Sequence, residues 1–386
     1  EKYVHDDNDA KKLWIIFIWI GVSMLILFMM MMMRRSCGLY LYGLTATGKE
    51  LETLVEVWGE KRYRAKQIRD WVQDGVTEYE KMTNLPKSLR EKLRDHIQPN
   101  ALKVAAEKIS KDGTIKRAYL LEDGQAIESV LMPYNKRNTA CISSQAGCAM
   151  GCVFCATGQM GFRRQLTATE IFEQVARYDA ELKQKEQRLS NVVFMGMGEP
   201  LLNYKEVSQS LKMIQDFLGI GARKITVSTV GVVPGIAKLS EEHPNVGLAI
   251  SLHAATNAER SALLPANARY GGLDPLMRAA KNHCELTGRR ISFEWALVQG
   301  INDDLDTART LGKLLQSYQL CQASHVNLIP LNPTDKFHGS QSLNSHSFAQ
   351  CLSSEFGVSA TIRLRRGIDI DAGCGMLANK LVVPSS

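Results

Sequence analysis

The sequence predicts an α/β fold in which parallel strands alternate with helices and the sheet curls toward a barrel. From Thr139 onward, short apolar runs that favour strands alternate with segments long enough for helices. The expected strands are 139–143, 191–196, 224–229, 246–252, 291–298, 324–330 and 360–364. Repeated βα units with right-handed crossovers place such strands side by side in one parallel sheet.

The first 36 residues form an apolar stretch outside the predicted functional domain. Leu13–Met33 contains no charged residue and is flanked by Lys11-Lys12 and Arg34-Arg35. As a helix rising about 1.5 Å per residue, this stretch would just span a bilayer. The methionine run Met29–Met33 indicates an alternative, in which translation begins inside the run. A membrane segment and a mis-annotated start are both left open.

Residues 37–100 are expected to form a small helical domain that binds RNA. Leu51, Leu54 and Val55 repeat at helix spacing. The stretch Lys61–Arg69 contains five cations and Tyr63. A solvated helix face is the common role of such a charge run, whereas contact with a phosphate backbone is the functional interpretation. The net charge of the chain, +7, is compatible with an RNA partner.

Residues 101–133 are expected to link this domain to the next by a β-hairpin. Two β-prone runs, Ile115–Leu121 and Ile127–Met132, are joined through Asp123-Gly124. The capping-box pattern Thr167–Glu170 then predicts a helix start within the catalytic domain, which we assign to residues 134–386.

The ends of the predicted strands carry polar and glycine-rich residues. In βα barrels the active site forms at this carboxyl edge of the sheet. The motifs that follow a strand there are Gly196–Pro200, Ser228-Thr229, Ser251–His253, Pro330–Pro333 and, after the last strand, Gly373–Gly375. Each motif alone is weak, because a Gly-x-Gly is commonly a turn. Together they predict one shared site.

Three thiols lie within eight residues after the first predicted strand, at Cys148, Cys152 and Cys155. The spacing C-x₃-C-x₂-C is too tight for two regular elements and suits a loop around a metal centre. Three thiolates on a cubane iron–sulfur cluster leave one iron without a protein ligand, which can bind a small molecule. A structural zinc site normally needs a fourth ligand in a second pair, and the sequence offers no such pair.

This spacing and its flanks resemble the RlmN/Cfr family of radical S-adenosylmethionine (SAM) enzymes, which methylate adenines in RNA. The similarity runs from about Gly43 to Leu381. The matching motifs are Cys141–Cys148, Cys155–Phe162, Gly196–Asn203, Ser228–Pro234, Ser251–His253 and Arg366–Gly375.

The resemblance implies a partial (β/α)6 TIM-like barrel of the radical SAM type, with a small N-terminal helical domain. Cys148, Cys152 and Cys155 would hold a [4Fe–4S] cluster. The residues that fall where the family binds SAM, two molecules per turnover, are Gly198, Glu199, Ser228, Ser251, Leu252, His253 and Asn332. Cys374 would be the cysteine that carries the methyl group, Cys141 its resolving partner, and Glu128 the general base.

The expected activity is methylation of adenine C2 in large-subunit rRNA, with tRNA as a further substrate. A Cfr-type enzyme that methylates C8 of the same adenine is the nearest alternative, and a non-catalytic RNA-binding protein is another. A flavodoxin or ferredoxin system would supply electrons to a monomeric protein. The chain has nine cysteines, an odd number, so a reducing compartment is expected, either the cytoplasm or an organelle. Membrane association depends on whether residues 13–33 are translated.

Overall fold

The computed structural model describes residues 48–73, 79–96, 102–332 and 334–380. The expectations for residues 1–36, including the apolar stretch, lie outside the described residues. Within the described residues, no helix combines the length and apolar character needed to cross a membrane. The chain divides into a helical unit and a larger α/β unit.

The helical unit is built from the amphipathic segments that the sequence predicts. Its elements are α3 (Gly48–Val57), α4 (Tyr63–Gln73), the 3₁₀ helix η2 (Tyr79–Lys81) and α5 (Lys87–His96). Their apolar faces meet in a small core whose fully buried members include Leu51, Val55, Leu89 and Leu93. A polar side chain also holds the end of α3 against α5, because Lys92 Nζ donates to the Trp58 carbonyl over 2.7 Å.

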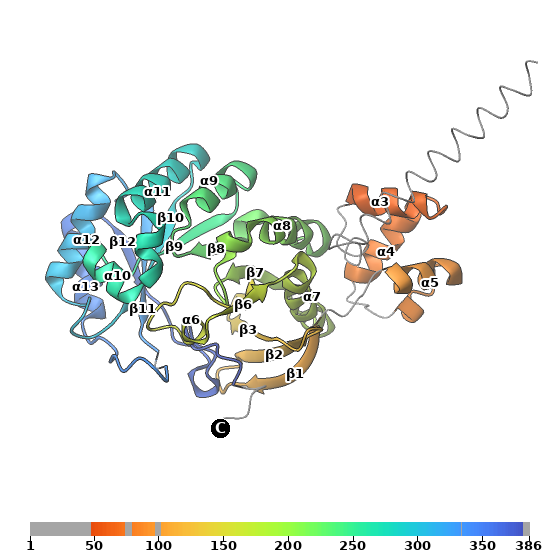
Figure 1. The fold of residues 1–386 in the computed structure, drawn as a ribbon, viewed down its shortest axis with the longest axis horizontal. Helices are drawn as coiled ribbons and strands as arrows, with labels where there is room; N and C mark the ends of the chain where they lie inside the picture. The colour runs from red at the N-terminus through yellow and green to blue at the C-terminus, as the bar shows by residue number, and fades with distance from the viewer. Residues whose placement is uncertain (1–47, 74–78, 97–101, 333, 381–386) are drawn as a thin grey trace, which may run out of the picture. The chain divides into compact units, whose positions relative to one another are not determined.

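The larger unit contains one ten-stranded sheet with the order β1-β2-β3-β4-β7-β8-β9-β10-β11-β12 (Figure 1). Its strands are β1 (Leu102–Ile109), β2 (Ile115–Leu121), β3 (Ala126–Tyr134), β4 (Arg137–Cys141), β7 (Leu189–Phe194), β8 (Ile225–Thr229), β9 (Gly247–Ser251), β10 (Ile291–Leu297), β11 (Ser324–Pro330) and β12 (Ser359–Ile362). From β4 to β12 every neighbouring pair is parallel. The predicted α/β class and parallel strands are confirmed.

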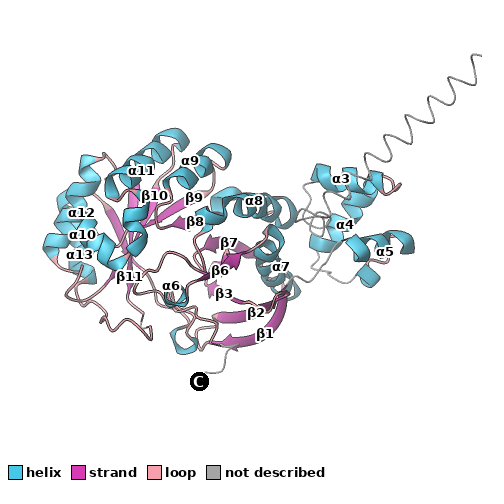
Figure 2. Cartoon of the chain, viewed as in Figure 1, coloured by secondary structure: helices cyan, strands magenta, loops and turns pink. Residues whose placement is uncertain are grey.

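Helices follow the strands and cover one side of the sheet (Figure 2). They are α7 (Ala168–Gln184), α8 (Tyr204–Leu218), α9 (Val233–Glu242), α11 (Leu273–Thr287), α12 (Leu305–Ser317) and α13 (Ser345–Phe356). The short helix α10 (Asn257–Leu263) packs instead beside the loop that carries Cys148 and Cys152. The predicted capping box is confirmed at the start of α7, where the Thr167 hydroxyl accepts from Glu170 N and the Glu170 carboxylate accepts from Thr167 N. This reciprocal pair satisfies two amides that the helix leaves unbonded.

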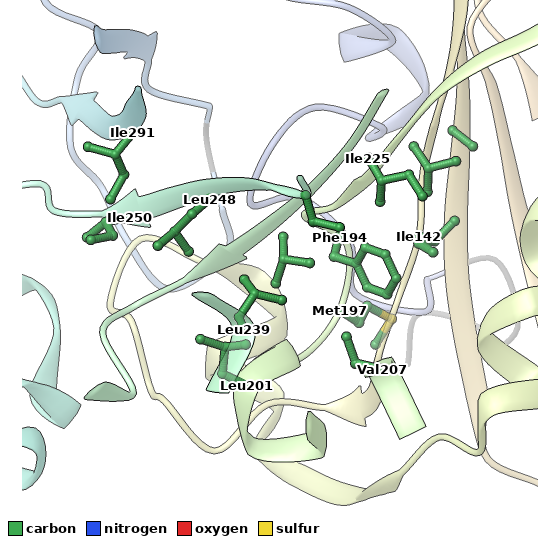
Figure 3. Close-up of a cluster of buried hydrophobic side chains, with 14 of the residues drawn as sticks. Ile142, Phe194, Met197, Leu201, Val207, Ile225, Leu239, Leu248, Ile250 and Ile291 are labelled. Carbon is green, nitrogen blue, oxygen red and sulfur yellow. The ribbon is translucent and has the colours of Figure 1, made fainter. Parts of the chain in front are cut away.

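The core lies between the sheet and these helices. Side chains from the strands, such as Phe194 and Ile225, share this core with Met197 from the loop after β7 and with Val207 from α8 (Figure 3). These side chains are at most 1% exposed. The apolar runs from which the strands were predicted are therefore runs of core residues, which explains why periodicity placed each strand to within one or two residues.

The hairpin expected around Asp123-Gly124 is present as β2 and β3, but it does not stand alone. β1 pairs antiparallel with β2, and β3 pairs antiparallel with β4, so three strands extend the parallel sheet. Strand β1 was not predicted, because all of its residues after Leu102 are exposed or half-exposed and the strand therefore shows little apolar alternation. The boundaries proposed between domains stay predictions.

Candidate active site

A single cavity gathers most of the residues singled out from the sequence. Its lining includes the thiol-bearing residues Cys141, Cys148, Cys152, Cys155 and Cys374, together with Gly198, Glu199, Ser228, Ser251, His253 and Asn332. These residues come from strand ends and loops far apart in the sequence, as expected at the carboxyl edge of parallel strands. Two predicted site residues, Leu252 and Glu128, do not line this cavity.

The loop Cys148–Cys155 runs from the small strand β5 (Gln145–Gly147) to the short helix α6 (Ala156–Met160). Gly147 is required at its start, because a Cβ atom there would lie 2.0 Å from the Gly161 carbonyl oxygen. Cys148 N donates to that same carbonyl over 3.0 Å, and Val153 N donates to the Leu263 carbonyl over 3.1 Å. The loop is thereby fixed at both of its ends.

The three thiols of this loop are held in an apolar environment. Cys148 and Cys152 are buried beside Met150, Leu263 and other apolar side chains, and Cys155 is half-buried. Burial, together with the charges of Cys155 and Glu199, raises the pKa of Cys148 to about 12. Burial also raises the pKa of Cys152 well above its usual value, and it raises the pKa of Cys155. Thiolates here repel one another, so binding them together requires a cationic group such as iron.

The donor set fits a cluster of irons. Within the described residues, no three His, Cys, Asp or Glu side chains converge closely enough to hold a single metal ion. A cubane cluster does not need such convergence, because each of its three cysteine ligands binds a different iron. Cys148, Cys152 and Cys155 all face the same cavity, which leaves room beside them for a small molecule.

The Gly198-Glu199 pair forms a rigid part of the cavity wall. Gly198 adopts φ +104°, and a Cβ atom there would come within 2.5 Å of Gln145 Cβ. The buried Glu199 carboxylate accepts from Leu201 N over 3.0 Å and from Val230 N over 2.8 Å. Burial nevertheless raises the pKa of Glu199 to about 7. A ligand ammonium group would find a preorganised carboxylate and backbone here.

His253 is held as a neutral imidazole. Its pKa falls to about 3, first because it is buried and then because the Arg260 charge is near. Its Nδ1 accepts from Ala296 N over 2.9 Å, so the ring proton lies on Nε2. The backbone adopts φ +60°, a strained conformation for a non-glycine residue. The buried Leu252 beside it packs into the core behind the cavity.

Cys374 approaches the same cavity from the C-terminal segment. Its side chain is exposed to solvent within the cavity, unlike the thiols of the cluster loop. Asn332 Nδ2 donates to the Cys374 carbonyl over 3.0 Å. Ala156 N donates to the Gly375 carbonyl over 2.7 Å, and the Thr157 hydroxyl donates to the Leu377 carbonyl over 2.7 Å. The two residues that follow Cys155 therefore anchor the segment that carries Cys374.

Cys141 and Cys374 share an electrostatic environment. Burial and the negative charge of Cys374 raise the pKa of Cys141 to about 12. Desolvation by the protein atoms around the cavity raises the pKa of Cys374 although the residue is reached by solvent, and the Arg363 guanidinium opposes the rise at both thiols. Both cysteines are free thiols in this structure, so the transient disulfide between them stays a prediction.

Glu128 is fully buried and does not line the cavity, and its expected role as the general base stays a prediction. Its carboxylate is fully buried on β3 and lies 3.0 Å from Lys116 Nζ. Ala378 N donates to its other oxygen over 2.9 Å. The sequence showed that Glu128 is an acidic residue in a hairpin. It did not show that Lys116 is buried opposite Glu128, because a buried lysine and a surface lysine look alike in a sequence.

Arg363 and Glu294 are cavity residues that the sequence reasoning missed. Arg363 Nη1 lies 3.5 Å from Glu294 Oε2, and Asn327 Nδ2 donates to Glu294 Oε1 over 2.8 Å. Burial raises the pKa of Glu294, while Arg363 opposes the rise. An acidic residue inside the apolar run Ile291–Leu297 was the available signal, because a buried carboxylate needs a partner.

Some arginines of the basic stretch Lys61–Arg69 bind to other residues of the helical unit. Arg62 pairs with Glu52 and Glu56 over 3.2 and 3.5 Å. Arg64 Nη1 donates to the Asn84 carbonyl over 2.9 Å. RNA contact by this stretch therefore stays a prediction. Cys284, Cys321 and Cys351 pack against the core and do not line the cavity.

Comparison with known proteins agrees with this geometry. Residues 41–98 match the family described as "Ribosomal RNA large subunit methyltransferase N-terminal domain", and residues 142–311 match the "Radical SAM superfamily". "Dual-specificity RNA methyltransferase RlmN 1" of Myxococcus xanthus is 46% identical, with 87% of this chain and 93% of the relative covered. "Probable dual-specificity RNA methyltransferase RlmN" of Thermotoga maritima is 42% identical over 86% of this chain and 96% of its own.

A solved structure shows the same fold. A radical SAM methyltransferase from Sphaerobacter thermophilus superposes with a TM-score of 0.83. It is 42% identical, and the match covers 88% of this chain and 99% of that chain. The predicted (β/α)6 barrel of the radical SAM type is therefore confirmed.

Proposed function

Because the chain belongs to the RlmN family of radical SAM methyltransferases, we propose that it methylates C2 of an adenine in large-subunit rRNA and also in tRNA. The family establishes the enzyme class and its cofactors, a [4Fe–4S] cluster and SAM. The observation that carries the proposal is the single cavity onto which the cluster-loop thiols, Cys141 and Cys374 all open.

The residues divide into a holding set and a reacting set. Cys148, Cys152 and Cys155 hold the cluster. The SAM contacts come from Gly198, Glu199, Ser228, Ser251, Leu252, His253 and Asn332. When bound, SAM supplies the methyl group and, through one-electron reduction by the cluster, the radical chemistry that an unreactive aromatic carbon requires. Leu252 contributes through its backbone, since its side chain belongs to the core.

The reacting set consists of Cys374, Cys141 and Glu128. The Cys374 sulfur carries the methyl carbon to the adenine. When that carbon bonds to adenine C2, it joins the sulfur covalently to the RNA. Glu128 accepts the ring proton. The Cys141 thiolate then attacks the Cys374 sulfur and forms a disulfide, while the sulfur–carbon bond breaks. The product carbon leaves with the electron pair of that bond and takes up a proton, which completes the methyl group. Glu128 can reach the base only if Ala378 N releases its carboxylate, so the Cys374 segment shifts during the cycle.

The proposal extends to partners and location. A flavodoxin or ferredoxin system supplies the electrons, and the protein acts as a monomer in a reducing compartment, either the cytoplasm or an organelle. All eight cysteines in the described part of the chain are free thiols, which supports a reducing compartment. Whether residues 13–33 anchor the protein to a membrane depends on the translation start.

The test uses the anaerobically reconstituted enzyme with SAM, a reductant and a fragment of large-subunit rRNA. Digestion of the RNA followed by mass spectrometry separates 2-methyladenosine from 8-methyladenosine. We expect only the former, and 8-methyladenosine alone would replace the C2 proposal with the C8 alternative. A parallel reaction with tRNA tests the second substrate. Absence of cluster absorbance after reconstitution would favour a non-catalytic RNA-binding protein.

A further inference from the structure

The segment Arg363-Leu364-Arg365-Arg366 follows β12 directly, and all four of its residues line the cavity. Tyr134, at the end of β3, lines the cavity too. Arg363 reaches Glu294, and Arg365 donates to Asn332 Oδ1 over 3.1 Å and to Gln341 Oε1 over 3.0 Å. Arg366 is the member of this segment that crosses to Tyr134.

Two guanidinium groups from distant parts of the chain lie over the Tyr134 ring. The Arg366 Cζ atom is 4.4 Å from the ring centroid, and the Arg137 Cζ atom is 4.7 Å from it. Arg137 is the cross-strand partner of Tyr134 in the β3–β4 hairpin, so one contact could serve only to stabilise that hairpin. Arg366 has no place in the hairpin. The Arg366 guanidinium therefore brings a second cation to the Tyr134 ring, beside the cavity.

The charges of this group are largely unneutralised. Within the described residues, no carboxylate lies within ion-pair distance of Lys136, Arg137 or Arg365. Arg366 has only Asp112, with its Nη1 4.0 Å from the carboxylate. Its buried Nε finds no hydrogen-bond partner in the part of the chain that the structure describes. A surface with this surplus of positive charge suits a polyanion.

An apolar residue stands in the same place. Leu364 is 74% exposed although it lies between arginines at the cavity. An exposed leucine alone needs no explanation. Next to Tyr134 and a surplus of positive charge, it completes the combination by which proteins bind unpaired nucleotides, namely flat or apolar surfaces for bases and cations for phosphates.

We propose that Tyr134, Arg137 and Arg366 form a docking platform for the RNA strand next to the target adenine, with Lys136 and Arg365 contacting its phosphates. The proposal rests on the proposed function, because it takes RNA as the substrate. An adenine that enters the cavity must leave its stack in the RNA, and its neighbours lose a stacking partner. A neighbouring base stacks on the guanidinium of the exposed Arg137 or takes its place on the Tyr134 ring, which offsets part of that loss.

The test measures binding of a fluorescently labelled RNA stem–loop with one unpaired adenosine in its loop to the reconstituted holoenzyme. Fluorescence anisotropy gives the dissociation constant at several salt concentrations. Arg137→Glu and Tyr134→Ala are each expected to weaken binding about tenfold. Lys136→Glu removes a proposed phosphate contact and should flatten the dependence of log K on log salt by about 0.7 for each phosphate that the protein no longer neutralises. Tyr134→Phe keeps the ring and should bind like the wild type.

The matched control is Arg223→Glu. Arg223 is exposed on the 3₁₀ helix η4 (Ala222–Lys224) before β8 and does not line the cavity. This charge reversal should change the dissociation constant by less than about twofold. Cluster absorbance and melting temperature verify that each variant is folded.

The outcomes separate the platform from the proposed function. Wild-type affinity in both Arg137→Glu and Tyr134→Ala, or an equal loss in Arg223→Glu, would overturn the platform. If the platform variants lose binding but the wild type leaves no methyl group on the RNA, the platform stands and the proposed function fails. If the wild type methylates RNA and the platform variants bind as it does, the function stands and the platform fails.

Discussion

The cluster loop and the Cys374 segment meet at one cavity but are built in opposite ways. In the cluster loop, Cys148 and Cys152 are buried in an apolar bed, and Gly147 fits directly against a neighbouring carbonyl. In the C-terminal segment, the Cys374 side chain is exposed. That segment is held by hydrogen bonds from Asn332 and from the start of α6 to its backbone carbonyls, and by the buried side chains of Met376 and Leu377 on its C-terminal side.

The difference assigns a fixed role to one region and a mobile role to the other. Dense apolar packing resists displacement, because moving one side chain opens a cavity around its neighbours. Hydrogen bonds to backbone carbonyls next to a cavity can exchange with water at a net cost of about 1 kcal/mol each. Under the proposed function, the loop that would hold the cluster is therefore rigid, whereas Cys374, the proposed methyl carrier, is on the region that would move between Cys141, the cofactor and the RNA.

The largest expected effect comes from exchanging one thiol in each region. Cys148→Ala removes a cluster ligand, so the reconstituted protein should lose most of its iron and visible absorbance and make no methylated RNA. Cys374→Ala should keep the cluster and yet make no methylated RNA, because the carrier sulfur is gone. Iron analysis, absorbance and mass spectrometry of digested RNA check both variants. Equal iron content in Cys148→Ala and in the wild type would contradict the assignment of the loop.

A second test addresses the partner thiol. In Cys141→Ala the Cys374 sulfur has no thiolate to displace it, so RNA should stay covalently attached to Cys374 and turnover should stop after one event. Denaturing gel electrophoresis shows the adduct, and mass spectrometry of peptides locates it. Cys284→Ala is the matched control, since that thiol packs against the core away from the cavity. Unchanged turnover without an adduct would exclude Cys141 as the resolving thiol.

The buried pair behind the Cys374 segment gives a third test. Lys116 Nζ bridges Glu128 and the Asp371 carbonyl, the latter over 3.1 Å. Lys116→Met leaves the buried Glu128 charge unpaired and should lower the free energy of unfolding by about 3–5 kcal/mol. The charge-neutral double variant Lys116→Met with Glu128→Gln should recover most of this loss. Urea denaturation followed by circular dichroism measures both.

The same pair links stability to the carrier segment. Lys116→Met should also speed alkylation of Cys374 by iodoacetamide, because Asp371 loses its anchor three residues before the thiol. Alkylation of Cys321, outside the cavity, serves as the internal reference. Equal destabilisation of the single and double variants would show that the loss comes from packing and not from the unpaired charge.

The sequence predicted the fixed region better than the mobile one. The spacing of Cys148, Cys152 and Cys155 and the strand ends at Ser228 and Ser251 could be read directly, because local motifs and strand periodicity follow from neighbouring residues. That these thiols open on one cavity with Cys374 follows from the sheet order, and the parallel βα pattern already implied that order.

What the sequence could not show depends on contacts between distant residues. The burial of Glu128 depends on Lys116 on the adjacent strand and on Ala378 near the end of the chain. The contact of Arg366 with Tyr134 joins the segment after β12 to the end of β3, more than two hundred residues away in the sequence. Neither contact leaves a local pattern. Family resemblance supplied a role for Glu128 but not its position in this conformation.

The smallest expected effects come from comparing one glycine in each region. Both adopt left-handed backbone, with φ +73° at Gly147 and φ +81° at Gly375. An added Cβ at Gly147 would overlap the Gly161 carbonyl, whereas at Gly375 its nearest neighbour would be the Phe154 carbonyl oxygen at 3.5 Å. Gly147→Ala therefore carries both strain and a clash with backbone, and we expect a loss of about 3 kcal/mol in the free energy of unfolding.

Gly375→Ala carries the conformational strain alone, so its expected cost is about 1 kcal/mol. Urea denaturation of the two alanine variants measures the difference directly. Iron retention gives a second measure: Gly147→Ala should bind less iron, and Gly375→Ala should bind as much as the wild type. Equal losses of stability in the two variants would mean that the carrier segment is packed as tightly as the cluster loop. The contrast between a fixed generator and a mobile carrier would then be wrong.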